Sequence, residues 1–299
     1  MVKGTHLFGP GSTGGQIVVG YNGSPAAQRA LVWAAAISSA LEDTLKIVHA
    51  VELDLVPSRR GYALRPLSPP LEMVAETLVG GPSTWPGRPL ARSRVRAVHA
   101  FGGPAAGLVD ASMSAELVVL GTRGRGRARS ALIGSVSYAV VAHAYCPVVV
   151  LHDVGRPARG AHDDLRIRGT DREVVCALRH GDGEAHAARA GRIVSAAARI
   201  ADACAAPLRL VTVGGGGVSD VAAQRLPYAV ASLASRHPGL VVTVDRLDGD
   251  PVSTLAETSS RSGLLVVGAP HRSGVTAVLA GDPSYRLIHD ATCPVMLVP

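Results

Sequence analysis

The sequence predicts an α/β protein built from two tandem doubly wound domains, each a parallel sheet with helices on both faces. Three observations support this prediction: a repeat that divides the 299 residues into two similar halves, short continuous apolar runs, and Ala-rich segments between those runs. Hydrophobic residues make up 47% of the chain and aromatic residues only 3%, which suits thin Val-rich strands packed under Ala-rich helices. A chain of this length can bury a sizeable core.

The repeat is clearest where the two halves end. Residues 116–151 align without gaps to residues 263–298 at a constant offset of about 147, which pairs Gly134 with Gly281 and Cys146 with Cys293. The starts of the halves correspond more loosely, in the order strand, polar turn, Ala-rich helix, strand. Because solenoid repeats run to only about 20–50 residues, so long a period indicates duplicated domains.

Each half follows the order β-α-β, a variable middle, then β-α-β-α-β. Apolar runs predict strands at about 17–21, 45–51, 93–99, 116–120 and 147–151, and again at about 173–178, 208–213, 240–246, 263–267 and 294–298. These runs are continuous rather than alternating, as is typical of parallel strands covered on both faces. Ser24 and Pro25 predict the start of the first helix, since Ser is a favoured N-cap and Pro suits the first helical position. The Pro-rich middle of the first half, 55–92, predicts only a short helix.

These elements predict a disordered Gly-rich leader at 1–15, a first domain at 16–152, a polar linker at 153–171 and a second domain at 172–299. Neither a secretory signal nor a membrane-spanning segment is predicted. The four cysteines lack CxxC spacing, which favours a reducing, cytoplasmic location.

The formal net charge of +7 fits anionic ligands but does not require them. Nucleic acid is not an expected partner, because the chain lacks helix-turn-helix, zinc and aromatic–basic signatures. No spacing of histidines or cysteines predicts a metal held by the protein.

Two predicted loops lead from the carboxyl end of a strand into a helix: GYNGSP, which begins at Gly20, and GTRGRG, which begins at Gly121. Glycines let backbone N–H groups approach an anion, and a helix N-terminus offers unpaired donors. Gly134 and Ser135 predict such a helix start, and Ser135 and Ser137 offer hydroxyl groups. The second loop is neither a Walker A loop nor a dinucleotide fingerprint. From these residues alone, an exposed structural loop explains the segment equally well.

The spacing Gly121-x2-Gly124-x9-Gly134-Ser135, preceded by ELVVLG and followed by CPVVVL, resembles the nucleotide-binding signature of the universal stress protein family, G-2x-G-9x-G-[ST]. The segment IVVGYNGSPAAQRALVWAA resembles the first strand and helix of that family. The resemblance is strong over 16–151 and weak over 172–299. It implies an ATP-binding regulatory protein with five parallel strands per domain in the order 3-2-1-4-5, and with domains paired through their fifth strands.

The resemblance also implies a set of site residues, carried over by position. The adenosine would lie beside Gly20, Tyr21 and Asn22, with the adenine against the backbone of Ala50. The ribose and phosphates would be lined by Leu120, Gly121, Arg123 and Gly124, and the phosphate chain would be cradled by Gly134, Ser135, Val136 and Ser137. The bound cofactor would be ATP or another adenine nucleotide, with Mg²⁺ held mainly by the phosphates.

Both halves depart from the family pattern. Asn22 stands where the family usually has Asp, so it keeps an acceptor but loses the charge; it could also serve only as an Asx-turn residue before Gly23. In the second half, His271 replaces a glycine and Asp282 replaces the serine, which would set a carboxylate beside the phosphates. We therefore expect nucleotide in the first domain only. A catalytic role for His271 with Asp282 lacks a matching nucleophile, and a decayed site is the simpler interpretation.

Three hypotheses follow for function. The chain is a nucleotide-binding stress-response regulator with slow or absent hydrolysis, an ATPase or phosphotransferase in which Ser135 or Ser137 becomes phosphorylated, or a nucleotide-free interaction scaffold. No catalytic residue is assigned. A protein partner and a homodimer stay open, and no membrane partner is expected.

Overall fold

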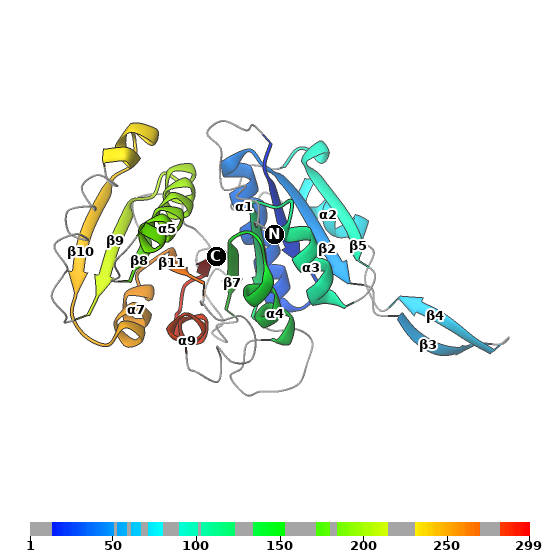
Figure 1. The fold of residues 1–299 in the computed structure, drawn as a ribbon. Helices are drawn as coiled ribbons and strands as arrows, with labels where there is room; N and C mark the ends of the chain where they lie inside the picture. The colour runs from blue at the N-terminus through cyan, green and yellow to red at the C-terminus, as the bar shows by residue number, and fades with distance from the viewer. Residues whose placement is uncertain are drawn as a thin grey trace.

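The strands of both halves form one continuous sheet (Figure 1). The computed structural model describes residues 14–50, 53–58, 61–66, 71–79, 90–100, 103–122, 134–152, 172–179, 184–214, 231–269 and 282–299. In the first half the sheet strands are β1 (Gln16–Gly20), β2 (Thr44–Ala50), β5 (Val95–Ala100), β6 (Leu117–Gly121) and β7 (Val148–Leu151). In the second half they are β8 (Val174–Leu178), β9 (Leu208–Val213), β10 (Val242–Leu247), β11 (Leu264–Gly268) and β12 (Val295–Val298).

The strand order is β10-β9-β8-β11-β12-β7-β6-β1-β2-β5. Counted within each half, this is the predicted order 3-2-1-4-5, and neighbouring strands within a half are parallel. Each predicted strand is present within about two residues of its expected position. The fifth strands, β7 and β12, pair antiparallel with Val149 opposite Met296, as the resemblance implied. The two five-stranded sheets thereby merge into a single ten-stranded one.

Helices cover both faces of this sheet, as predicted. One face carries α1 (Pro25–Leu41), α2 (Leu71–Val79), α5 (Glu184–Ala203) and the helical residues 231–236. The other face carries α3 (Pro104–Ser112), α4 (Ser135–His143), α7 (Pro251–Ser259) and α9 (Pro283–Asp290). Each layer buries an apolar core that contains residues of both halves.

The first helix begins where the sequence predicted. Ser24 is its N-cap, and the Ser24 hydroxyl accepts a hydrogen bond from the backbone N–H of Ala27 at 3.2 Å. The helix ends at Leu41, and its C-cap, Glu42, has a φ of 59°, which lies in the left-handed region. Ala205 adopts the same conformation just after α5, with φ 51°, so the two helices end in equivalent ways.

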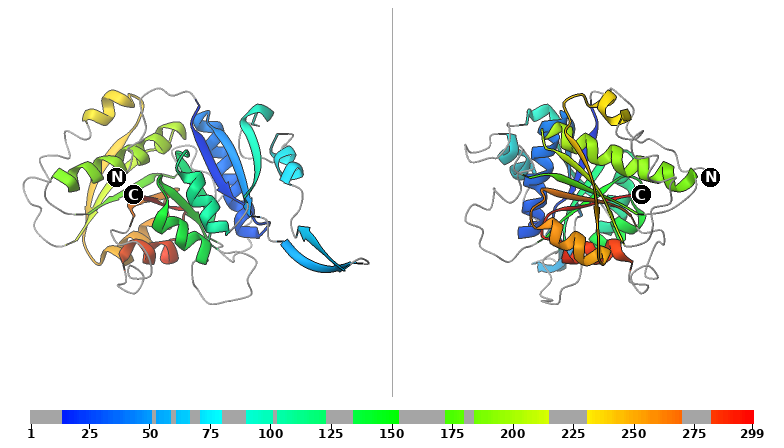
Figure 2. Two further views of the ribbon diagram at one scale, coloured as in Figure 1. Left: turned by 45° about the vertical axis from the view of Figure 1, so that its right-hand side comes forward. Right: turned by 90° about the vertical axis from the view of Figure 1, so that its left-hand side faces the viewer.

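The middle of the first half holds a hairpin that the sequence analysis did not predict. Its strands are β3 (Leu53–Ser58) and β4 (Gly61–Pro66), which pair antiparallel. Figure 1 and the left view of Figure 2 show this hairpin projecting away from the main sheet. The helix that follows, α2, spans nine residues and is short, as expected. A short 3-10 turn, η1 (Arg92–Arg94), precedes β5.

The repeat extends to individual hydrogen bonds. At the end of α3, the Ser112 hydroxyl accepts from the backbone N–H of Tyr145 at 3.0 Å. At the end of α7, the Ser259 hydroxyl accepts from the N–H of Thr292 at 2.9 Å. Both bonds connect the end of a helix to the segment before the fifth strand, so the two halves share this hydrogen bond at equivalent positions.

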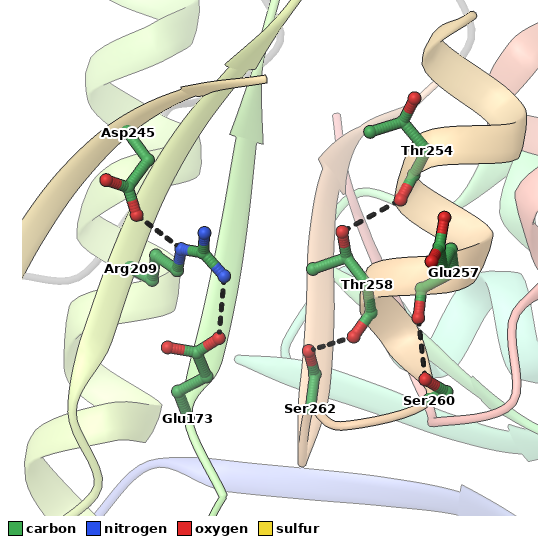
Figure 3. A network of polar contacts seen from close by, with 8 residues as sticks. All are labelled: Glu173, Arg209, Asp245, Thr254, Glu257, Thr258, Ser260 and Ser262. Atoms are coloured by element: carbon green, nitrogen blue, oxygen red, sulfur yellow. Dashed lines mark hydrogen bonds and ion pairs between the residues drawn. The ribbon is translucent and has the colours of Figure 1, made fainter. Parts of the chain in front are cut away.

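The second half also has a polar network of its own (Figure 3). Arg209 on β9 lies between Glu173 and Asp245, with nitrogen–oxygen distances of 3.2 and 2.5 Å. Nearby, the Ser262 hydroxyl donates to the carbonyl of Thr258 at 2.8 Å beyond the end of α7. These contacts all lie within one half.

The predicted domain boundaries stay a prediction. Most of the leader (1–13) and all of the linker (153–171) lie outside the described residues. Gly15 is held against β2, since its carbonyl accepts a hydrogen bond from the N–H of Thr44 at 2.8 Å. Among the described helices, none has both the length and the apolar character needed to cross a bilayer.

Candidate functional site

The candidate site lies where β1 neighbours both β2 and β6. The strand order reverses direction at this point, and ligands of open α/β sheets bind in the crevice at the carboxyl ends of strands beside such a reversal. Gly20 ends β1 and Leu120 lies near the end of β6. A Cβ on Gly20 would lie 2.7 Å from Leu120 Cδ2, so the two predicted loops begin side by side.

The first loop is shaped by its own side chains. The Asn22 Oδ1 accepts a hydrogen bond from the backbone N–H of Ser24 at 3.1 Å, which is an Asx-turn. Gly23 has φ 73°, a left-handed conformation that costs glycine little. Asn22 therefore has the turn-forming role that the sequence left open, and its side-chain N–H₂ group is the part that a ligand could use.

His49 is a site residue that the sequence analysis missed. Its side chain is buried, and its Nδ1 lies 2.5 Å from the backbone carbonyl of Tyr21. Because a carbonyl only accepts, Nδ1 carries the proton in this contact. The N–H of Tyr21 donates to Val48 at 2.9 Å, and the Tyr21 hydroxyl donates to Gln28 at 3.0 Å. His49 thus holds the first loop beside the end of β2, next to Ala50. In the sequence, the polar His49 near the end of an apolar run could have indicated this role.

The base of the second loop is closed by backbone hydrogen bonds. The N–H of Gly134 donates to the carbonyl of Thr122 at 2.7 Å, and the N–H of Thr122 donates to Leu151 at 2.8 Å. The chain therefore leaves β6 and enters α4 at the same place. Arg123 and Gly124, two of the predicted site residues, lie outside the described residues.

Among the described residues, no side chain caps the N-terminus of α4. Gly134 is the N-cap and makes no side-chain capping bond. The first N–H groups of any helix have no partner within the helix and carry a positive partial charge. Ser135 and Val136 follow in the first turn, with Ser135 exposed. This corner is therefore a ready anion-binding site.

Ser137 has a structural contact as well. Its hydroxyl donates to the backbone carbonyl of Gly121 at 2.8 Å, which ties the start of α4 to the end of β6. Since the one proton of this hydroxyl is used there, Ser137 can offer a ligand its backbone N–H but no hydroxyl hydrogen. Of the two serines expected to supply hydroxyl donors, Ser135 is the one whose hydroxyl makes no hydrogen bond with the described residues.

Gly121 is required by packing. A Cβ at this position would lie 2.6 Å from the backbone carbonyl carbon of Ala26 and 2.7 Å from its oxygen. The glycine lets α1 approach the end of β6 closely, so its place in the signature has a structural reason independent of any ligand.

The corresponding corner of the second half is capped by the chain itself. Asp282 is the N-cap of α9, and its Oδ1 accepts from the N–H of Ser284 at 2.9 Å. Pro283 supplies no N–H. The Ser284 hydroxyl donates to Gly268 at 2.9 Å, the same contact that Ser137 makes with Gly121. The frame is thus retained, but a carboxylate already occupies the anion-binding end of the helix.

An arginine also fills this second corner. Matched from their shared left-handed ends, α1 and α5 place Arg189 at the position of Ala26. The Arg189 guanidinium donates to the carbonyl of Ala269, just past β11. Burial lowers the pKa of Arg189, and Asp282 opposes that shift. The remaining departure, His271, lies outside the described residues.

Within the described ranges, no group of three or more His, Cys, Asp or Glu side chains could hold a metal ion. All four cysteines carry buried thiols, including Cys146 and Cys293, each of which precedes a proline. Burial raises the pKa of each of these two thiols to about 12.

We expect all four native thiols to be inert near neutral pH, because all four are buried and the reactive form is the thiolate, which apolar surroundings disfavour. Treatment of the folded protein with a thiol-specific chromogenic disulfide should release almost no chromophore over minutes at pH 8, and denaturant should release four equivalents per chain. Rapid modification of Cys146 in the folded state would contradict this expectation.

Together, the described residues define a tandem, doubly wound α/β protein in which one helix start beside a strand-order reversal lacks a side-chain cap and its counterpart is capped by a carboxylate. The family model described as the universal stress protein family matches residues 15–152 and 185–299. The chain therefore belongs to the universal stress protein family.

Individual relatives agree with this membership over nearly the whole length. Universal stress protein Rv2623 of Mycobacterium tuberculosis strain H37Rv is 29% identical over 297 residues, covering 94% of this chain and 95% of the relative. Universal stress protein Rv2005c of the same strain is 27% identical over 290 residues, covering 94% and 96%. The crystal structure of a universal stress protein from Archaeoglobus fulgidus superposes with a TM-score of 0.65 at 15% identity, covering 95% of this chain and 97% of that one.

Proposed function

We propose that this universal stress protein is a stress-response regulator that binds ATP, or another adenine nucleotide, in its first half. The observation that supports this most directly is the contrast between the two helix starts. Gly134 leaves the first turn of α4 uncapped, whereas Asp282 caps α9 with its own carboxylate. Of the two helix starts as described, that of α4 can accept a phosphate without displacing a carboxylate.

The proposed contacts follow the geometry of the two loops. The adenosine lies against Gly20, Tyr21 and Asn22, with the adenine near Ala50, which follows His49 at the end of β2. The phosphates lie at Leu120 and Gly121 and at the first turn of α4, where Ser135 gives a hydroxyl and Val136 and Ser137 give backbone N–H groups. Arg123 and Gly124 complete the set by position. Mg²⁺ is held mainly by the phosphates.

Hydrolysis is proposed to be slow or absent, so that occupancy itself is the signal. The hydroxyl of Ser137 is committed to Gly121, and no described acidic group is hydrogen-bonded to Ser135. The buried cysteine thiols suit the cytoplasmic location expected from the sequence.

The first test is direct. Denaturing the purified protein and analysing the released small molecules by mass spectrometry should yield an adenine nucleotide, and calorimetry on stripped protein should show one ATP bound per chain. Absence of both would reject the proposal. Binding of a different nucleotide class would reject the choice of adenine.

Ser135→Asp separates binding from folding. The new carboxylate would stand beside the phosphates, where like charges about 4 Å apart repel by about 1 kcal/mol in water and several times more when partly desolvated. We expect ATP affinity to fall at least tenfold. An acidic residue in the first helical turn is itself favourable, so thermal stability of the ligand-free protein should not fall.

The matched control is Asp282→Asn, the removal of the corresponding carboxylate in the second half. It should leave the affinity and the single-site stoichiometry unchanged, because an Asn side chain also caps a helix N-terminus and Pro283 has no N–H to offer a phosphate. Equal ATP affinity in Ser135→Asp and the native protein would contradict the proposed phosphate position.

A further inference from the structure

An ion-pair cluster joins the two halves on the α1 and α5 face of the sheet. Arg199 on α5 lies 2.6 Å from the carboxylate of Asp43, which precedes β2, and also forms an ion pair with Glu116, which precedes β6. The Asp43 side chain is only 2% exposed, and the Arg199 and Glu116 side chains are 22% and 24% exposed. A second-half cation thus neutralises two first-half carboxylates in a largely buried position.

The repeat offers two equivalent positions for such a contact, one from each half to the other, and the charged residues occur at one of them. When the left-handed residues after α1 and α5, Glu42 and Ala205, are aligned, Arg199 is equivalent to Ala36. The same alignment makes Asp43 equivalent to Ala206. Glu116 corresponds to Gly263, since the N–H of Glu116 donates to the carbonyl of Gln16 at the start of β1 and the N–H of Gly263 donates to the carbonyl of Glu173 just before β8. The two halves are related by a pseudo-two-fold axis, and the equivalent position on its other side therefore has Ala36, Ala206 and Gly263 in place of the three charged residues.

The antiparallel pair of β7 and β12, called the seam below, does not by itself determine which domain pairs with which. β7 is VVVL and β12 is VMLV, and every residue of both is buried. The pseudo-two-fold axis passes between Val149 and Met296, which are equivalent residues paired with each other. Two copies of β7, or two copies of β12, would present nearly the same apolar edge as the native pair.

We propose that Asp43, Glu116 and Arg199 determine which domain pairs with which: the surface of the first half is built to accept a second half and to reject another first half. If two first halves paired, Asp43 and Glu116 would face Ala36 of the other copy and be buried without a cation. If two second halves paired, Arg199 would face Ala206 and be buried without an anion. Burying an unpaired charge is costly, and discrimination of this kind arises from the penalty on the wrong complex.

The Arg209 cluster in Figure 3 resembles the Arg199 cluster but lies within one half, so it provides a comparison for the proposed role in domain pairing. Arg209 also lies between two carboxylates, Glu173 and Asp245, but all three belong to the second half. Its charges are satisfied whichever domain lies beyond β12, so it cannot select a partner. This makes Arg209 the matched control for Arg199.

The test reads the pairing directly in the full-length chain. Val149→Cys and Met296→Cys are introduced together, and the protein is refolded from denaturant at high concentration under reducing conditions. The oxidant is added only after refolding, because in the folded protein burial raises the pKa of the native Cys146 and Cys293 thiols to about 12. Peptide mapping then distinguishes 149–296 bonds from 149–149 and 296–296 bonds, and light scattering gives the mass of the particles.

With the native charges we expect 149–296 bonds to exceed 149–149 bonds at least tenfold. Adding Arg199→Glu brings three carboxylates together in the native pairing, so 149–149 and 296–296 bonds should become comparable to 149–296 bonds, and the particle mass should rise. Adding Arg209→Glu instead should leave the native ratio and mass. The proposal is overturned if Arg199→Glu also keeps the native ratio and mass, or if Arg209→Glu changes the pairing as much.

A second variant covers the case in which Arg199→Glu does not refold. Arg199→Ala combined with Ala36→Arg moves the cation to the first half, where it would meet Asp43 and Glu116 of another copy. The 149–149 bond should then become the principal one. Retention of 149–296 as the principal bond in this variant would equally overturn the proposal.

Discussion

Gly121→Ala should lower the free energy of unfolding by about 3 kcal/mol, with or without nucleotide. The added methyl group would lie 2.6 Å from the backbone carbonyl carbon of Ala26 and 2.7 Å from its Cβ. Neither atom can move without shifting the start of α1, so the strain cannot be relieved by a rotamer change. Urea unfolding followed by circular dichroism measures the loss.

Gly191→Ala is the control for this change. Gly191 lies inside α5, and a Cβ there would have no neighbour within 4 Å. Alanine should therefore stabilise the helix by about 0.5–1 kcal/mol. If Gly121→Ala unfolds at the native urea concentration, the packing explanation of this glycine is wrong. If it is destabilised as expected, a loss of ATP binding in Gly121→Ala would say nothing about nucleotide contacts, and Ser135→Asp is the better probe.

Arg199→Met should be the second strongly destabilising change, at about 3 kcal/mol near neutral pH. Removing one partner of a buried ion pair leaves an uncompensated charge, which costs about 3–5 kcal/mol. The lower end applies because Arg199 and Glu116 keep some contact with solvent. Neutralising the acids as well, with Asp43→Asn and Glu116→Gln, should recover most of the loss, since the charges then disappear together.

The loss in Arg199→Met should depend on pH. Burial raises the pKa of Asp43 in the folded protein, and Arg199 is the largest influence opposing that rise. A folded pKa above the unfolded one favours folding at low pH, and this contribution is lost as pH rises through the folded pKa. Without Arg199 the pKa rises further. The difference in stability between the native protein and the variant should therefore be small below about pH 4, the ordinary aspartate range, and grow above it.

An exposed arginine provides the comparison for Arg199→Met. Arg92 lies 3.6 Å from Glu76, with side chains 78% and 60% exposed. Such surface pairs contribute about 0–1 kcal/mol, so Arg92→Met should change stability little at any pH. A similar loss in both variants would mean that burial of the interdomain cluster does not matter.

Much of the fold could be predicted because its signals are local or repeated. Continuous apolar runs marked each strand of the large sheet, and Ser24 marked the start of α1 through an ordinary N-cap. The constant offset between the halves predicted that the fifth strands would be equivalent, and Val149 and Met296 indeed pair across the seam. The hairpin β3–β4 was missed because its two apolar segments lie in a Pro-rich region, which was interpreted only as a short helix.

The candidate site was predictable only in outline. The sequence indicated the glycines and serines of the second loop, but it could not reveal that the Ser137 hydroxyl is used by Gly121 or that His49 holds Tyr21. These contacts depend on how neighbouring strands are aligned. The partners of Arg199 lie in the other half of the chain, and nothing in the local sequence of α5 distinguishes this arginine from its neighbours.

The seam between β7 and β12 also affects the risk of aggregation. Two separate five-stranded sheets would expose four edge strands, whereas the merged sheet has β5 and β10 as its terminal strands. Among the strands described, VVVL and VMLV are short, uncharged and wholly buried, the kind of segment that recruits other chains when exposed. Because both halves belong to one polypeptide, β7 and β12 each meet the other strand at an effective concentration of about millimolar. Duplication within one gene product thus protects the most adhesive edges of the fold even when the protein is scarce.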